Sequence, residues 1–152
     1  KTNTQTPQNF PLVRYSDVLL MAAEAVNESE NSPINALDFL NKVRRRAKGV
    51  AVETGNISVD LAGLSYEQLK GEIKNERARE LCFEALRKND LIRWGDFYDK
   101  MKERLSEVPT GTNTLYTSMY NYYNNAKERD VIWPIPSYEM GVNPKLDQNP
   151  GW

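Results

Sequence analysis

Apolar residues recur at helical spacing twice in the first third of the chain. The first stripe has apolar positions near i, i+3, i+4 and i+7, and it predicts a helix from about Leu12 or Ser16 to Glu28. A polar break follows. The second stripe begins after Ser32, a natural N-cap, and ends before Gly49, which suits the position just past a helix end.

Two helices joined by so short a polar turn should pack antiparallel. Small alanines on both helices would let them approach closely. Residues 12–48 are therefore predicted to form one tetratricopeptide-like helix pair, although no second copy at a fixed period is visible in the chain.

A second helical region is predicted over residues 65–105. Ser65 and Gln68 have the spacing of a capping box, so a third helix should begin there and run to about Arg87. A fourth helix should follow from Asp90, because apolar residues again recur on one side. Residues 50–64 have the composition of a loop, and residues 106–130 that of a long loop or a weak helix.

The final segment, residues 131–152, holds four of the eight prolines and two of the three tryptophans. Each proline fixes φ and pushes the preceding residue to extended geometry, which predicts an ordered, extended strap. Trp133 and Trp152 should be at least partly buried on the helices, and Ser137 should cap a single helical turn that Gly141 ends. The predicted fold class is mainly α: a helical domain with the helix pair, long loops and this proline-rich strap.

Composition excludes several kinds of site. The 20 basic and 21 acidic residues nearly balance, which argues against a positively charged nucleic-acid surface. Histidine is absent, and the single cysteine, Cys82, is predicted to be a small buried hydrophobe. We therefore expect no metal site, no cofactor and no catalytic set built on histidine or cysteine.

Charged residues interrupt the core-facing stripe of the third predicted helix. Arg77, Glu80 and Glu84 fall in the same sector as Ile73 at about 100° per residue. One hypothesis makes the two glutamates an acid/base pair acting on a glycan. The other makes them part of a buried ion-pair lattice that sets helix register. Nearby arginines favour the lattice, because a general acid must hold a proton; the candidate partners are Arg44, Arg46 and Arg93.

Four tyrosines lie among asparagines in the later part of the chain. Tyrosine faces and side-chain amides suit sugar rings, which present apolar C–H faces and hydroxyl groups. One interpretation is therefore a ligand-binding surface; the alternative is a loop whose tyrosines pack on the helical body. The candidate ligand-binding residues are Tyr116, Tyr120, Tyr122 and Tyr123.

Several blocks in series resemble the C-terminal part of the SusD/RagB family. The most specific is the ending, Asn143-Pro-Lys-Leu-Asp-Gln-Asn-Pro-Gly-Trp152. The others are residues 10–25, Asn41-Lys-Val-Arg-Arg-Arg-Ala-Lys-Gly49, Glu76-Arg-Ala-Arg-Glu-Leu-Cys-Phe-Glu84, residues 90–95 and Trp133-Pro-Ile-Pro136. The family usually has Glu-Gly-x-Arg after the third helix. Here Ala85 replaces the glycine, which favours a continuous helix.

The resemblance implies a function for a longer parent protein, of which residues 1–152 would be the C-terminal helical region. Such proteins are surface-exposed lipoproteins of the outer membrane in Bacteroidetes. They bind glycans or other nutrients and work with a SusC-like TonB-dependent transporter. The resemblance implies no enzymatic activity, no nucleic-acid partner, and a lipid anchor outside this chain. The chain begins with Lys1 rather than Met, which we interpret as a cut within that longer protein.

An alternative function is a helical scaffold that binds a protein partner and has no ligand site in this part of the chain. A third hypothesis, an enzyme using Glu80 and Glu84 on a glycan, would require release of reducing sugar.

Overall fold

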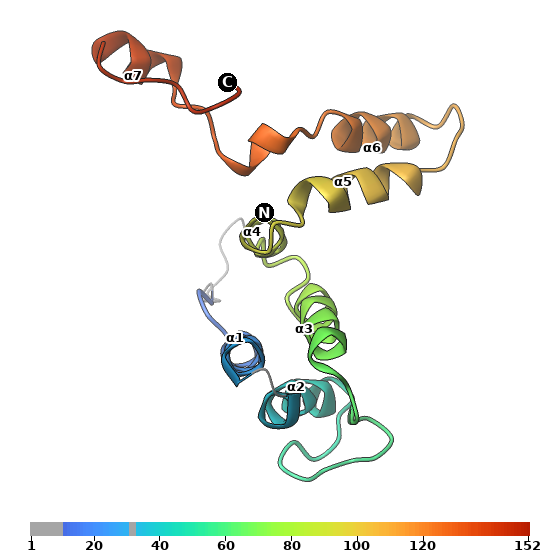
Figure 1. Cartoon of the computed structure of the whole chain (residues 1–152). Coiled ribbons are helices and arrows are strands. Elements are labelled where there is room, and N and C mark those ends of the chain that lie inside the picture. Colours follow the sequence, from blue (N-terminus) through green and yellow to red (C-terminus); the bar gives the residue numbers. More distant parts are fainter. Residues whose placement is uncertain (1–10, 31–32) are drawn as a thin grey trace, which may run out of the picture. The chain divides into compact units, whose positions relative to one another are not determined.

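The computed structural model describes residues 11–30 and 33–152, and every regular element in this part of the chain is helical (Figure 1). The predicted mainly α fold class is confirmed. The chain divides into two compact units, Lys1–Arg87 and Lys88–Trp152.

The first unit is a three-helix cluster. It contains α1 (Tyr15–Glu30), α2 (Pro33–Ala47) and α3 (Tyr66–Glu80), and each of these helices packs against the other two. The apolar stripes meet in one core, in which the small residues Ala23 and Ala36 let the backbones approach. The other core residues are Leu19, Leu20, Leu40, Val43, Leu69 and Ile73.

The predicted punctuation of these helices is confirmed where the structure describes it. Gly49 has φ +69°, and the amide of Val50 donates to the carbonyl of Arg45 at 3.0 Å, as in a Schellman ending. Ser65 and Gln68 form the expected capping box at the start of α3. The proposed N-cap Ser32 lies outside the described residues.

The third helix ends earlier than predicted. It stops at Glu80 rather than near Arg87, and a turn follows in which Phe83 and Ala85 have φ values of +67° and +61°. The expected continuous helix is therefore wrong. A physical reason is visible at the turn, because Arg14 binds the carbonyl oxygen of Glu80 and the carboxylate of Glu84, and these bonds hold the chain away from the helical path.

The loop between α2 and α3 is held by side chains of α2. The amide group of Asn41 donates to the carbonyl of Leu61 at 3.0 Å and accepts from its N–H at 2.9 Å. The guanidinium of Arg45 forms a two-pronged bond to Asp60, at 2.7 and 2.6 Å. Residues predicted to be an irregular loop are thus ordered by polar groups on a helix.

The second unit contains α4 (Arg87–Arg93) except for its first residue. It also contains α5 (Phe97–Ser106), α6 (Thr114–Asn124), the 3₁₀ turn η1 (Glu128–Val131) and α7 (Ser137–Val142). The predicted fourth helix is divided at Gly95, whose φ of +75° ends α4. The segment predicted as a loop or weak helix contains α6, which packs against α5, and Asn113 caps α6 through its side chain (Figure 1).

The closing strap is ordered, but it folds on itself. The side chain of Gln148 bonds both the N–H and the carbonyl of Ile135, at 2.8 and 2.9 Å. The indole N–H of Trp152 donates to the carbonyl of Ile132 at 3.0 Å. Trp133 is 77% exposed, so its predicted burial is wrong; the strap's order comes from polar bonds to its backbone.

The helical turn in the strap also differs from its prediction. Ser137 is the first residue of α7, with Pro136 in the cap position, and the helix continues through Gly141 to Val142. Proline at the cap has no side-chain acceptor, so this start lacks the bond that the serine was expected to make.

Candidate functional site

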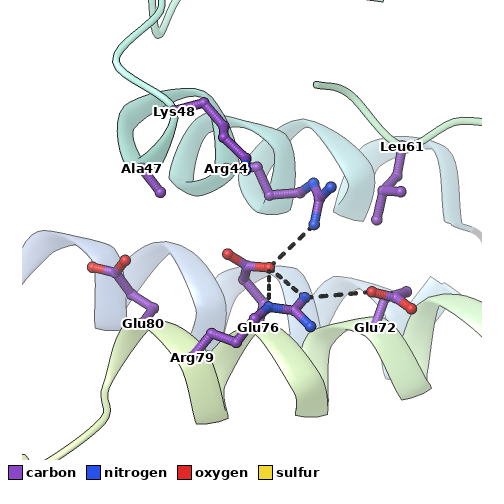
Figure 2. A pocket seen from close by; sticks show the side chains of 8 residues that line it. All are labelled: Arg44, Ala47, Lys48, Leu61, Glu72, Glu76, Arg79 and Glu80. Carbon is purple, nitrogen blue, oxygen red and sulfur yellow. Dashed lines mark hydrogen bonds and ion pairs between the residues drawn. The ribbon is translucent and has the colours of Figure 1, made fainter. Parts of the chain in front are cut away.

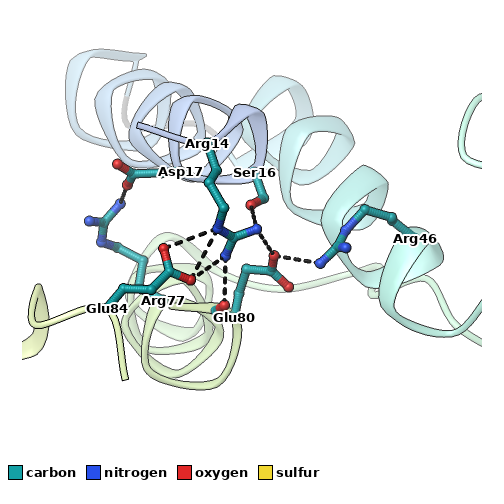
Figure 3. A network of polar contacts seen from close by, with 7 residues as sticks. All are labelled: Arg14, Ser16, Asp17, Arg46, Arg77, Glu80 and Glu84. Atoms are coloured by element: carbon teal, nitrogen blue, oxygen red, sulfur yellow. Dashed lines mark hydrogen bonds and ion pairs between the residues drawn. The ribbon is translucent and has the colours of Figure 1, made fainter. Parts of the chain in front are cut away.

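Glu80, the last residue of α3, and Glu84, in the turn that follows, both bind Arg14, which immediately precedes α1 (Figure 3). Its Nη2 donates to Oε1 of Glu84 at 2.6 Å and to the backbone oxygen of Glu80 at 2.9 Å. Its Nη1 donates to Oε1 of Glu80 at 3.0 Å and to the hydroxyl of Ser16 at 2.8 Å. Arg46 of α2 also binds Glu80, at 2.5 Å. We call these five residues the Arg14 network.

The side chain of Glu80 is only 6% exposed, far less than those of Arg14, Glu84 and Arg46. Burial pushes its pKa upward, but hydrogen bonds from Arg46, Ser16 and Arg14 outweigh burial and lower the pKa below its ordinary value. The hydrogen bond that Arg14 donates to the Glu84 carboxylate in turn raises the pKa of Arg14. Glu80 is therefore an ionised carboxylate held by cations, which is unsuited to a general acid.

A second buried pair lies beside the Arg14 network. Arg77 of α3 binds Asp17 in the first turn of α1 at 2.8 Å, and both side chains are almost wholly buried (Figure 3). Asp17 also carries its negative charge near the positive end of the α1 dipole. The ion-pair lattice predicted for the third helix is thus confirmed, and it ties α3 to α1.

The predicted partners were only partly right. Arg46 reaches Glu80, but Arg44 binds Glu76 at 3.3 Å and Arg93 binds Asp90 at 2.9 Å. Sequence reasoning missed Arg14, which is separated from Glu80 by 66 positions. Helical periodicity relates residues only a few turns apart, so it cannot predict a contact between residues 66 positions apart.

A pocket of about 410 Å³ lies between α2 and α3 (Figure 2). Its wall carries as many cations as carboxylates, and Arg79 binds Glu76 at 2.6 Å and Glu72 at 3.5 Å. Because the positive and negative side chains of the wall are equal in number, the pocket offers little net field for a charged ligand. The lining residues are Arg44, Ala47, Lys48, Leu61, Glu72, Glu76, Arg79 and Glu80.

The four candidate tyrosines all lie on or within α6, but they do not form one flat surface. At about 100° per residue, Tyr116, Tyr120 and Tyr123 fall within roughly 60° of one another, while Tyr122 lies roughly 160° from Tyr120. Tyr116 and Tyr123 are half-buried. Tyr122 is 66% exposed and Tyr120 is 49% exposed. The rings of Tyr122 and Tyr123 meet edge to face at 78° and 5.2 Å.

The residues of α6 itself are uncharged, and the Lys102 ammonium of α5 donates to the carbonyl oxygens of Tyr123 and Asn124. Ser118 and Asn121 precede Tyr122 by one turn or less, and Asn125 follows within one turn; all three side chains are exposed. This flank combines an accessible ring with hydroxyl and amide groups that can both donate and accept hydrogen bonds. Such a surface can stack against the apolar face of a sugar and bond its hydroxyls.

In residues 11–30 and 33–152, no three or more acidic, cysteine or histidine side chains are grouped to hold a metal ion. None of the helices in the same ranges combines the length and the apolar character that crossing a membrane requires.

The chain belongs to the SusD family, whose sequence pattern matches residues 1–152. The SusD-like protein P25 of Formosa agariphila is 37% identical over 138 residues, which cover 91% of this chain and 23% of that protein. The starch-binding protein SusD of Bacteroides thetaiotaomicron is 27% identical, over 98% of this chain and 22% of its own length.

A crystal structure shows the same fold. A SusD homolog from Bacteroides thetaiotaomicron aligns over 99% of this chain with a TM-score of 0.79 and 30% identity, and the alignment covers 30% of that homolog. The chain spans about a quarter of the length of the curated relatives that it matches.

Proposed function

We propose that this chain is part of a cell-surface glycan-binding protein that works with a TonB-dependent outer-membrane transporter. The observation that carries the proposal is the match of the whole chain to the SusD family, which includes a protein named for starch binding. The proposal places the whole protein at the outer membrane, held by a lipid anchor outside these residues. It assigns no catalysis to the chain, in line with the paired state of Glu80.

Within this chain, α6 is the surface that we propose for the glycan. Tyr122 supplies the most exposed ring of the four tyrosines, and the neighbouring asparagines supply amide groups. Tyr116, Tyr120 and Tyr123 remain candidate contacts, although at about 100° per residue all three lie on a different side of the helix from Tyr122. The position of Tyr120 on the opposite flank makes it a matched comparison of the same residue type.

The test is affinity electrophoresis and calorimetry of the longer protein against a panel of polysaccharides. We expect binding to at least one glycan, and we expect Tyr122→Ala to weaken it about tenfold, the scale of one lost aromatic contact. Tyr120→Ala should have a smaller effect. If no glycan is bound, the proposed function is wrong. If a folded Tyr122→Ala protein binds as well as the unaltered one, the ligand surface is not this flank of α6.

A scaffold for a protein partner is the second candidate function. The observation that favours it is the number of exposed apolar side chains on the α1–α2 pair, among them Tyr15, Met21 and Ile34. Replacing Ile34 by Ser should weaken binding of the transporter and leave glycan affinity unchanged, which copurification and calorimetry would measure.

A further inference from the structure

The turn after α3 contains an apolar residue with a left-handed backbone conformation and a side chain that is exposed to solvent. Phe83 has φ +67° and is completely exposed, at 103%. Its neighbour Cys82 is exposed as well, against prediction, because the helix that would have buried it has already ended. Residues other than glycine rarely adopt the left-handed region, and an exposed phenylalanine forgoes the stabilisation that burial gives.

The turn is nevertheless fixed by a buried side chain and by hydrogen bonds from Arg14. Leu81 is buried, with 4% of its surface exposed, and it anchors the start of the turn. Arg14 binds the carbonyl of Glu80 on one side of the exposed pair and the carboxylate of Glu84 on the other (Figure 3). A strained conformation persists only where surrounding contacts determine it, and such sites are concentrated where proteins bind or act. A rigidly held, accessible aromatic ring is the kind of group that anchors an interface.

We infer that Phe83 is an anchor that docks against the part of the SusD-family protein lying outside these 152 residues. The curated relatives are matched over only 22–27% of their length, and the solved homolog over 30% of its chain. In proteins as long as these relatives, most of the residues lie outside the matched part and are available to cover Phe83. A tethered segment meets the anchor at a high effective concentration, so it occupies this site more readily than a free partner does.

Apolar surface also continues along the segment that carries Arg14. Val13 and Tyr15 flank this arginine, and both are exposed. Because Arg14 reaches Glu84, this segment lies beside the turn (Figure 3). The docking surface that we infer therefore includes Phe83, Cys82 and the exposed residues beside Arg14.

The first test uses the sign of a stability change in the full-length protein. If Phe83 were exposed there, Phe83→Gly would relieve the left-handed backbone and raise Tm. If the ring is docked, the same variant loses the buried ring, and Tm falls by several degrees. Ala85→Gly is the matched control, because it relieves the same backbone strain in the same turn without removing a ring. A rise in Tm for Phe83→Gly overturns the inference.

The second test needs no variant. Alkylation of Cys82 by iodoacetamide is followed by peptide mass spectrometry, in the native full-length protein and after unfolding in urea. Docking predicts about 100-fold slower alkylation in the native state. Rapid alkylation of Cys82 in the native protein overturns the inference. Protection of Cys82 that disappears when the protein is diluted also overturns it, because such protection would come from a second copy of the protein. The inference stands only if Cys82 is protected and Tm falls for Phe83→Gly.

Discussion

Arg14 shows how one side chain can connect distant parts of a sequence. Its guanidinium presents five donors in a planar fork, and the structure uses them on Glu84, Glu80 and Ser16. Burying Glu80 is costly unless it is paired on several sides, and Arg14 and Arg46 provide that pairing. The network consequently ties α1, α2 and the end of α3 together.

Glu80→Gln should lower the free energy of unfolding by about 2 kcal/mol, because it leaves buried donors facing a neutral amide. Urea unfolding followed by circular dichroism measures the change. Glu103→Gln is the matched control, since Glu103 pairs with Lys100 on the exposed face of α5 and should change stability little. Equal effects of the two substitutions would show that the Arg14 network does not stabilise the fold.

The pH dependence of stability should report the same carboxylate. The pKa of Glu80 is lowered from its ordinary value of 4.5, because the bonds from Arg46, Ser16 and Arg14 outweigh burial. Its ionisation therefore stabilises the folded state fully above that value, and the contribution is lost as pH falls through the lowered pKa. Between about pH 6 and pH 3, the Tm difference between the unaltered protein and Glu80→Gln should narrow. A difference that stays constant would rule out this linkage.

At the scale of elements, the ends of helices explain most departures from the periodic pattern. Gly95 divides the fourth predicted helix because a left-handed residue closes α4. The end of α3 has no glycine, and Ala85 adopts φ +61° there. Tertiary bonds to Arg14 therefore impose a conformation that the local sequence disfavours.

Ala85→Gly should stabilise the chain by about 1 kcal/mol, because glycine adopts the left-handed conformation without a Cβ clash. Thermal unfolding would show the change as a higher Tm. Ala62→Gly, in the loop before α3, is a control for the added flexibility of glycine in the unfolded chain. If Ala85→Gly lowers Tm as much as this control does, the left-handed turn is not a source of strain.

At the scale of the whole molecule, the strap belongs to the second unit and is ordered by side chains bonding its own backbone. Arg129 of η1 precedes the strap and contacts its C-terminal end, since it donates to the carbonyl of Gly151 and stacks on Trp152 at 4.2 Å. Lys88 of α4 lies 4.6 Å from the ring centre of Trp133. These contacts join the strap to the rest of the unit even though Trp133 is exposed.

Removing residues 131–152 from the 152-residue chain should lower the stability of the second unit by about 2 kcal/mol, because stacking and charge-assisted hydrogen bonds are lost. Scanning calorimetry would measure the loss. Trp133→Ala is the comparison, and it should shift Tm much less because the ring is mostly exposed. An unchanged Tm after truncation would mean that the strap contributes nothing to the fold.

The sequence alone determined the class of the fold, because helical periodicity and caps are local. The stripes of α1 and α2, the capping box at Ser65 and the ending at Gly49 could all be read from neighbouring residues. The charged sector of α3 could be predicted as an ion-pair lattice, because charges in a core-facing stripe require partners. The family resemblance rested on blocks of residues, and the match over the whole chain confirmed it.

Only the tertiary structure decided which groups meet and which stay exposed. Arg14 joins α3 from 66 positions away, and that contact ends the helix, turns Phe83 outward and exposes Cys82. The tyrosines of α6 were predicted together, but helix geometry separates Tyr120 from Tyr122 around the axis. Burial depends on what lies opposite a side chain in space, and a linear pattern records only what lies beside it in the chain.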